Sequence, residues 1–372
     1  MRILIAPNTF KGSLDALEVA RSIARGLAQG KLSLDLEICP IADGGDGTLP
    51  IAASYFGADL ISVDTVDALG RPLVGRYGWS EASSTALIEL AEASGIRHLR
   101  TGELNPWKAN TYGTGLILEK ALLQSPKHVY LTIGGSASID GAVGLLEGMG
   151  IKFLDKYGKI LHGLDASRIS EIEGVDRREV MAKLKDANLK ILCDVENPLL
   201  GAKGSAEVFG PQKGANQNDV EKLENALAHL SDVIKKDFGI DIKKLKHGGA
   251  AGGVAAVMYG VLGAELIDGA NFVLNVSEFR GKLKFADLVI TGEGKIDVQT
   301  LSGKGPGLAA VEAKKAGKRV IGFCGVTELT DGSIEPFDEI ITVNQPHESL
   351  EDSIKNTQYN LEMAAKKFAE GL

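Results

Sequence analysis

The segment LVITGEG, residues 288–294, decides the fold class of this 372-residue chain. It is an apolar run that ends on two glycines around Glu293. Four other segments are apolar runs of the same form: ILIAPN (3–8), VYLTIGG (129–135), ILCDVEN (191–197) and VIGFCG (320–325). Short runs that are almost entirely apolar are typical of strands buried on both faces of a parallel sheet.

Helical patterns follow several of these runs. Residues 13–28 place leucines and alanines on one face, with Ser13 as the expected N-cap. Residues 218–236 carry acids early and lysines late, and residues 305–317 have Pro306 near the first turn. Strands that alternate with helices predict an α/β fold with a parallel sheet.

Two regions depart from this alternation. Residues 58–90 and 151–180 contain short β-rich runs separated by turn residues, which is typical of antiparallel hairpins. We therefore expect a Rossmann-like α/β domain made of residues 1–60 and 280–372, with a second α/β domain of mixed sheet, residues 61–279, inserted into it.

The composition narrows the classes of function. The chain is longer than the roughly 250–300 residues at which single cores split, so two domains are expected. The net charge is −8, the pI is about 5.4, and the basic residues form no run, which argues against nucleic-acid binding. Three scattered cysteines, no signal peptide and no apolar stretch of about 18 residues predict a cytoplasmic protein without a membrane segment.

Several familiar catalytic motifs are absent. The sequence contains no Walker-type G-x-x-x-x-G-K-[ST], no G-x-G-x-x-G, no H-E-x-x-H and no G-x-S-x-G. Its six histidines show no spacing of metal ligands. These absences argue against P-loop enzymes, dinucleotide dehydrogenases, zinc proteases and serine hydrolases.

Glycine-rich loops with hydroxyls, acids and single lysines remain as candidate sites. Each is also compatible with a plain turn, and the HGGAAGGVAA stretch (247–256) favours close helix packing. The candidate residues are Lys11 and Ser13 in PNTFKGS, Asp43 in ADGGDGT, Gly134, Gly135 and Ser136 in IGGSASID, Asp194 in CDVENP, Lys213 in FGPQKGA, and Glu293 and Asp297 in TGEGKID, with Lys304 beyond them.

This set of groups matches what phosphoryl transfer requires. Carboxylates such as Glu293 and Asp297 repel a phosphate unless a cation lies between them, and Mg²⁺ takes one or two carboxylates together with waters. Lysines and backbone N–H groups neutralise phosphates, and a base accepts the hydroxyl proton. The loops therefore favour a small-molecule kinase or another phosphate-handling α/β enzyme.

Taken in order, the loops resemble the bacterial glycerate kinase family. The segments that carry the resemblance are APNTFKGSL, IADGGDGT, TYGTG, IGGSASIDGAVG, CDVENPL, VFGPQKGA, GAAGG and ADLVITGEGKIDVQT, followed by Gly303-Lys304. They extend from residue 6 to residue 304. The resemblance implies two α/β domains with the site in the cleft between them, and phosphorylation of D-glycerate by ATP with Mg²⁺. In many members the product is 2-phosphoglycerate.

The chemistry of phosphoryl transfer suggests a role for each candidate. Lys11, Ser13 and the loop 134–136 are expected to hold the glycerate carboxylate or the ATP phosphates, with Glu293 and Asp297 holding Mg²⁺. Asp194 is the expected base and Asp43 its rival, and Lys213 is expected to stabilise the transferring phosphoryl group.

Two alternatives stay open at this point. The chain could phosphorylate a related small hydroxy acid, or it could be a non-catalytic ligand-binding relative. The second alternative is favoured by Ile139, which stands with Ser138 where the family usually has Thr-Asn. We expect a monomer or homodimer that binds D-glycerate and ATP and neither nucleic acid nor membrane.

Overall fold

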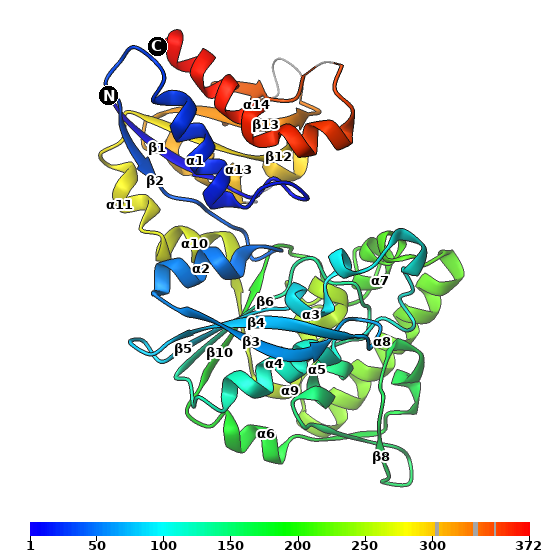
Figure 1. Cartoon of the computed structure of the whole chain (residues 1–372). Helices are drawn as coiled ribbons and strands as arrows, with labels where there is room; N and C mark the ends of the chain where they lie inside the picture. The colour runs from blue at the N-terminus through cyan, green and yellow to red at the C-terminus, as the bar shows by residue number, and fades with distance from the viewer. Residues whose placement is uncertain (302–304, 330–333, 346) are drawn as a thin grey trace. The chain divides into compact units, whose positions relative to one another are not determined.

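The chain is divided by its own contacts into two compact units. The computed structural model describes residues 1–301, 305–329, 334–345 and 347–372. Unit 1 comprises residues 1–43 and 269–372, and unit 2 is the continuous segment 44–268 inserted into it (Figure 1). The domain boundaries expected from the sequence, after residues 60 and 279, stay a prediction. We propose that the domains are instead the two units, whose boundaries fall after residues 43 and 268.

Unit 1 is built on a five-stranded parallel sheet with the order β14-β13-β12-β1-β2. Its strands are β1 (Arg2–Pro7), β2 (Asp35–Ile38), β12 (Leu288–Ile296), β13 (Arg319–Thr327) and β14 (Glu339–Thr342). Its helices are α1 (Ala16–Leu27), α10 (Gly269–Val276), α11 (Phe279–Leu283), α12 (Val298–Leu301), α13 (Gly305–Lys315) and α14 (Leu350–Glu370). The strands predicted at 3–8, 288–294 and 320–325 and the helix at 305–317 are confirmed.

One face of this sheet is covered by α1 and α14, which lie side by side (Figure 1). Ile23 of α1 and Leu361 of α14 pack with strand residues such as Ile290 in one buried cluster. This burial follows from the alternation of strands that are apolar on both faces with amphipathic helices.

Gly292 lets β12 approach β13 closely. It pairs with Pro7 on one side and with Phe323 on the other. A Cβ added at Gly292 would lie 1.9 Å from the carbonyl oxygen of Phe323. The glycine of the opening segment therefore has a packing role in the centre of the sheet.

We expect Gly292→Ala to lower the free energy of unfolding by about 1–3 kcal/mol, because the added methyl group overpacks the backbone of β13. Gly281→Ala is the matched control, since a Cβ there meets nothing within 4 Å and alanine is the better helix former in α11. Urea unfolding of both variants measures the difference. Equal stability of the two variants would contradict the packing role.

Unit 2 contains a six-stranded mixed sheet with the order β11-β10-β6-β5-β4-β3 and a three-stranded antiparallel sheet with the order β8-β7-β9. In the larger sheet β11, β10, β6 and β5 are parallel neighbours, whereas β4 and β3 are antiparallel. The strands are β3 (Asp59–Val66), β4 (Pro72–Ser80), β5 (Thr85–Glu89), β6 (His128–Thr132), β7 (Lys152–Leu154), β8 (Ile160–Leu161), β9 (Gly174–Asp176), β10 (Asn188–Cys193) and β11 (Glu265–Asp268).

The helices of unit 2 include the long α8 (Gln217–Phe238), which begins with a capping box of Asn216 and Asp219. The other α-helices are α2 (Thr48–Phe56), α3 (Ala91–Ser94), α4 (Tyr112–Leu122), α5 (Val143–Gly148), α6 (Arg178–Lys183), α7 (Ser205–Phe209) and α9 (Val254–Leu262). Short 3₁₀ helices are η1 (Ile96–His98), η2 (Thr101–Glu103), η3 (Ala166–Glu171), η4 (Pro211–Lys213) and η5 (Ala250–Gly253).

Alternate residues of the central strands face opposite layers. Leu87 of β5 packs against Leu49 of α2, whereas its neighbour Ile88 joins Ile117 of α4 in the main core. The expected hairpins are confirmed as the antiparallel pairs β3–β4, β4–β5 and β7–β8. Unit 2 is thus the α/β unit with mixed sheet that the sequence predicts.

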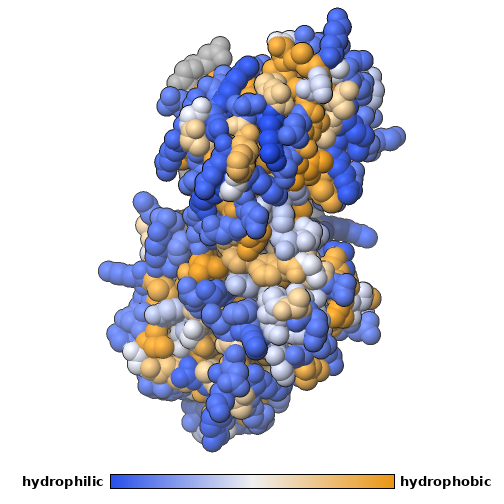
Figure 2. Space-filling view, turned by 90° about the vertical axis from the view of Figure 1, so that its left-hand side faces the viewer, coloured by the Kyte–Doolittle hydropathy of each residue, from blue (hydrophilic) through white to orange (hydrophobic). Residues whose placement is uncertain are grey.

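No helix among the residues described is long and apolar enough to cross a bilayer. On the face displayed in Figure 2, hydrophilic residues predominate and hydrophobic ones form separate patches among them.

Candidate active site

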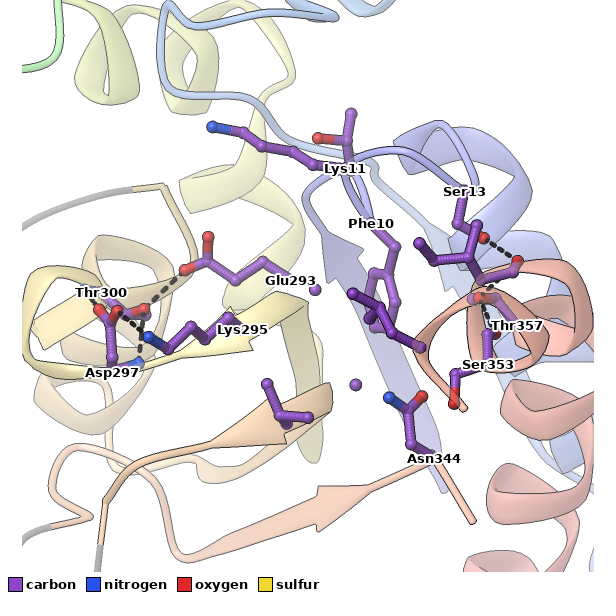
Figure 3. A pocket seen from close by; sticks show the side chains of 16 residues that line it. Phe10, Lys11, Ser13, Glu293, Lys295, Asp297, Thr300, Asn344, Ser353 and Thr357 are labelled. Carbon is purple, nitrogen blue, oxygen red and sulfur yellow. Dashed lines mark hydrogen bonds and ion pairs between the residues drawn. The ribbon is translucent and has the colours of Figure 1, made fainter. Parts of the chain in front are cut away.

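A cavity of about 360 Å³ lies at the carboxyl edge of the sheet of unit 1 (Figure 3). Its walls come from the ends of β12 and β13, from the segments after β1 and β14, and from the first turns of α14. The strands of the sheet are parallel, so their carboxyl ends meet at one edge, where α/β sheets bind ligands. Four of the predicted site residues line this cavity: Lys11, Ser13, Glu293 and Asp297.

The loop after β1 is held by its own polar groups. The N–H of Asn8 donates to the carbonyl of Gly292 at 2.8 Å, and the Asn8 side-chain oxygen accepts from the N–H of Thr9 at 2.7 Å. The Asn8 amide also donates to Asp43 at 3.3 Å. Lys11 follows as an exposed side chain that makes no hydrogen bond or ion pair with the described residues. This ammonium group is therefore available to an anion.

Ser13 does not cap the first helix, contrary to the sequence prediction. The N-cap of α1 is Asp15, whose carboxylate accepts from the N–H of Glu18 at 2.8 Å. The hydroxyl of Ser13 instead donates to the carbonyl of Ile354 in α14 at 2.8 Å. Because its proton is already used, Ser13 contributes mainly to the wall of the cavity, and its anion-binding role stays a prediction.

The acids at the end of β12 form a second part of the site. Thr300 donates to Glu293 Oε1 at 2.7 Å, and Asp297 accepts from the N–H of Gln299 at 2.8 Å. Lys295 lies 2.7 Å from Glu328 and 3.6 Å from Asp297, and its bond to Glu328 raises the pKa of the Lys295 ammonium. In Figure 3 these side chains gather on one side of the cavity.

The donor set of this acidic end fits a magnesium ion. The described residues contain no cluster of three or more His, Cys, Asp or Glu side chains that could hold a metal. Mg²⁺ is usually bound by one or two carboxylates together with waters and phosphate oxygens, so Glu293 and Asp297 suffice. Lys304, named in the sequence analysis, lies outside the described residues.

In unit 2 two of the predicted glycine-rich loops touch each other. The N–H of Gly134 donates to the carbonyl of Gly44 at 3.2 Å. A Cβ at Gly134 would lie 2.4 Å from the Cα of Gly45, so the contact requires glycine. The loops 44–47 and 133–136 are thereby joined through their backbones at the carboxyl ends of β5 and β6.

Lys213 lies against the second of these loops, and its side chain is buried and does not protrude from its turn. Its ammonium is buried and donates to the hydroxyl of Ser136 at 2.7 Å and to the carbonyl of Ser138 at 2.6 Å. Burial lowers the pKa of Lys213 to about 7, although the nearby Asp140 opposes the shift. Its role in stabilising the phosphoryl group stays a prediction.

The burial of Lys213 leads to a prediction about how the stability of the protein depends on pH. The folded-state pKa of Lys213 lies near 7 and the unperturbed value is 10.5, so between these values the unfolded chain binds the proton and the native chain does not. The contribution of Lys213 to the free energy of unfolding therefore rises as pH increases from about 7 to 10.5. We expect Lys213→Met to flatten that rise.

Urea unfolding of wild type and Lys213→Met at pH 7, 8 and 9 gives the two profiles, and their difference removes the titration of other groups. Lys236→Met is the control, because this lysine is exposed. Parallel profiles for wild type and Lys213→Met would contradict the assigned burial.

Asp140 holds the segment that follows the loop 133–136 by hydrogen bonds from four donors. Its fully buried carboxylate accepts from the N–H of Thr111 at 2.9 Å, the hydroxyl of Thr111 at 2.7 Å, the hydroxyl of Ser138 at 2.8 Å and the N–H of Gly144 at 3.3 Å. Burial raises the pKa of Asp140, and these donors oppose the shift. The neighbouring Ile139 has no exposed surface and belongs to the core, so its side chain faces no ligand.

Glu89 and Arg97 are polar residues of this region that the sequence analysis missed. Glu89 is buried and accepts from the N–H groups of Gly47 at 3.0 Å and Leu49 at 2.8 Å, which begin α2. Burial raises the pKa of Glu89 to about 7, against those two bonds. Arg97 contacts Glu89, Asp46 and Glu92. An acid at the end of the apolar run TALIE was the available signal.

The two candidate bases occupy different units. Asp194 is exposed and directly follows β10, the parallel neighbour of β6, so it lies at the same edge of the sheet as the loop 133–136. Asp43 is half-buried in unit 1 and accepts from Asn8. The role of base stays a prediction for both residues.

Polar loops at the carboxyl ends of parallel strands in both units define the chain as an α/β protein built for binding small polar ligands. The chain belongs to the glycerate kinase family, because the model of the Glycerate kinase family matches residues 3–372. It is therefore a kinase, and the resemblance inferred from its loops is confirmed.

Individual relatives agree with this assignment. The chain is 35% identical over 371 residues to a glycerate kinase of Halalkalibacterium halodurans, covering 99% of this chain and 97% of the relative. It is 35% identical over 377 residues to the glycerate 2-kinase of Escherichia coli, covering 100% and 98%. A crystal structure of a candidate glycerate kinase 2 from Salmonella typhimurium LT2 matches with a TM-score of 0.85 and 35% identity, covering 100% of this chain and 98% of the other.

Proposed function

We propose that this protein transfers the γ-phosphoryl group of ATP to the 2-hydroxyl of D-glycerate in the presence of Mg²⁺, giving 2-phosphoglycerate and ADP. The observation that carries the proposal is the cavity of unit 1, which brings two carboxylates together with a lysine that has no partner among the described residues, at the carboxyl edge of a parallel sheet. Family membership supports the substrate class, since the relatives named above include glycerate kinases and a glycerate 2-kinase.

The proposed roles follow from charge. Lys11 neutralises phosphate oxygens, and Glu293 and Asp297 hold Mg²⁺, which supplies positive charge to the phosphates when bound. A donor aimed at charge that develops in the transition state is typically worth about 3–4 kcal/mol. The side chains of unit 1 thus bind and orient the donor substrate.

The glycine-rich loop of unit 2 supplies the second set of groups. The N–H group of Gly135 and the hydroxyl of Ser136 lie near the strand end and suit the carboxylate of glycerate or a phosphate, whereas Gly134 fixes the loop because its N–H donates to Gly44. Asp194 accepts the proton of the reacting hydroxyl. The oxygen of that hydroxyl forms a bond to the γ-phosphorus, and the bond from the γ-phosphorus to the oxygen of the β-phosphate breaks, which releases ADP. Asp43 is the alternative base.

The three cysteines support a location in the cytoplasm. Cys39, Cys193 and Cys324 are buried and none of them forms a disulfide, and burial raises the pKa of the Cys324 thiol to about 12. Buried thiols without a disulfide suit a reducing compartment.

A coupled assay of ADP formation tests the function directly. We expect turnover with D-glycerate, ATP and Mg²⁺, and its loss when EDTA removes the metal. Phosphorus and carbon NMR of the product distinguishes 2-phosphoglycerate from 3-phosphoglycerate. A panel of L-glycerate, D-lactate and tartronate serves as the comparison, and no ADP formation with D-glycerate would refute the proposal.

A further inference from the structure

We propose that the cavity of unit 1 binds the nucleoside part of ATP and that Asn344 contacts the edge of the base. This inference rests on the proposed function, because it assigns one substrate of that reaction to one pocket. The cavity lies entirely within unit 1, so the assignment depends on this unit alone.

The size of the cavity favours the larger substrate. Its volume of about 360 Å³ falls in the range of roughly 300–1,000 Å³ that is typical of pockets for drug-sized ligands. A three-carbon acid would occupy only a small part of that space and would leave the apolar wall in contact with water. A purine nucleoside matches the space better.

One end of the cavity is apolar and exposed. Leu350 and Ile354, from the first turns of α14, line it with exposed fractions of 74% and 38%, and the ring of Phe10, which also lines the cavity, is buried. Exposed apolar side chains that gather around a concavity mark a ligand site rather than an ordinary surface. A planar base is a ligand that such a wall can cover.

Asn344 supplies a polar group at this apolar end. It follows β14, and Figure 3 shows its amide directed into the cavity. Within the described residues the amide makes no hydrogen bond. Gly325 opposite carries no side chain, and a Cβ there would lie 3.4 Å from Asn344 Nδ2. An amide has both a donor and an acceptor, which is what bidentate contact with adenine requires.

The charged side chains lie at the other end. Glu293, Lys295 and Asp297 gather on the side of the cavity opposite to Ser353 and Thr357 (Figure 3). A ligand that is apolar at one end and carries several negative charges at the other therefore has one preferred direction. ATP has this polarity, with its base toward Asn344 and its phosphates toward Lys11 and the metal-binding acids.

Isothermal titration calorimetry with ADP and with tripolyphosphate tests the inference without requiring turnover. We expect Asn344→Leu, which keeps the size of the side chain but cannot hydrogen-bond, to weaken ADP binding about tenfold and to leave tripolyphosphate binding unchanged. Leu350→Trp places a bulky side chain at an exposed position of the apolar wall and is expected to reduce ADP binding in the same selective way.

Gln345→Ala is the matched control, because this neighbouring amide is exposed and lies outside the cavity. In the kinase assay we expect Asn344→Leu to raise KM for ATP and to leave KM for D-glycerate unchanged. ADP binding by both cavity variants at the affinity of wild type, no ADP binding by wild type, or an equal loss of ADP and tripolyphosphate binding would each overturn the inference. A wild type that binds ADP but does not phosphorylate D-glycerate would refute the proposed function alone.

Discussion

Replacing Asp194 by asparagine is expected to lower kcat for D-glycerate phosphorylation by about 10²–10⁴, while KM for D-glycerate changes little. The asparagine keeps the shape of the side chain but cannot accept the hydroxyl proton. Asp194 is exposed at the carboxyl end of β10, so the change leaves the core intact. Steady-state kinetics with varied D-glycerate and saturating ATP measure both constants.

Asp43→Asn is measured in parallel, since Asp43 is the rival base. Asp186→Asn, an exposed aspartate between α6 and β10, is the control and is expected to behave as wild type. If Asp194→Asn kept the kcat of wild type while Asp43→Asn lost it, the proton acceptor would be reassigned to Asp43.

The second large effect concerns stability. We expect Asp140→Ala to lower the free energy of unfolding by about 3–5 kcal/mol, because it leaves several buried donors without an acceptor and leaves Lys213 without a nearby negative charge. Thermal unfolding followed by circular dichroism measures the change. A shift of about 2–4 °C for each kcal/mol is expected for a unit of this size.

Asp64→Ala controls for the loss of an aspartate, because Asp64 is exposed on β3 and has no ion pair within the described chain. Asp140→Asn should fall between the two, since an amide keeps one of the acceptor oxygens. Equal melting temperatures of Asp140→Ala and Asp64→Ala would contradict the anchoring role.

The parts of the fold that the sequence predicts well are those with strong local signals. Long apolar runs such as LVITGEG identified the buried central strands, because a strand covered on both faces has few polar residues. The short strands β2, β11 and β14 were missed, since four residues of mixed polarity leave no clear period. Asp15 caps α1 in place of the predicted Ser13, because the preceding loop bends back on itself where Phe10 pairs with Leu14.

The site was predictable in its residue types and less so in its geometry. Lys11 follows β1, Glu293 lies in the last part of β12 and Asp297 directly follows it. Because β1 and β12 are parallel neighbours, the rule of converging strand ends was enough to bring these residues together. The burial of Lys213 depends on loops far away in sequence, which no local pattern reveals. Asn344 ends the run EIITVN, which has the same form as the other strand ends and was the available signal.

The insertion of unit 2 into unit 1 has a consequence for synthesis on the ribosome. β1 is translated first, yet its partner residues on β12 lie 285 residues later, as for Ala6 and Thr291. At about 5–20 residues per second the apolar strand β1 waits roughly 15–60 s for that neighbour, while the continuous segment 44–268 can already fold. Its other neighbour, β2, is translated early, so the nascent chain carries one unpaired edge of a hydrophobic strand for most of its translation, and the speed of translation becomes a determinant of yield.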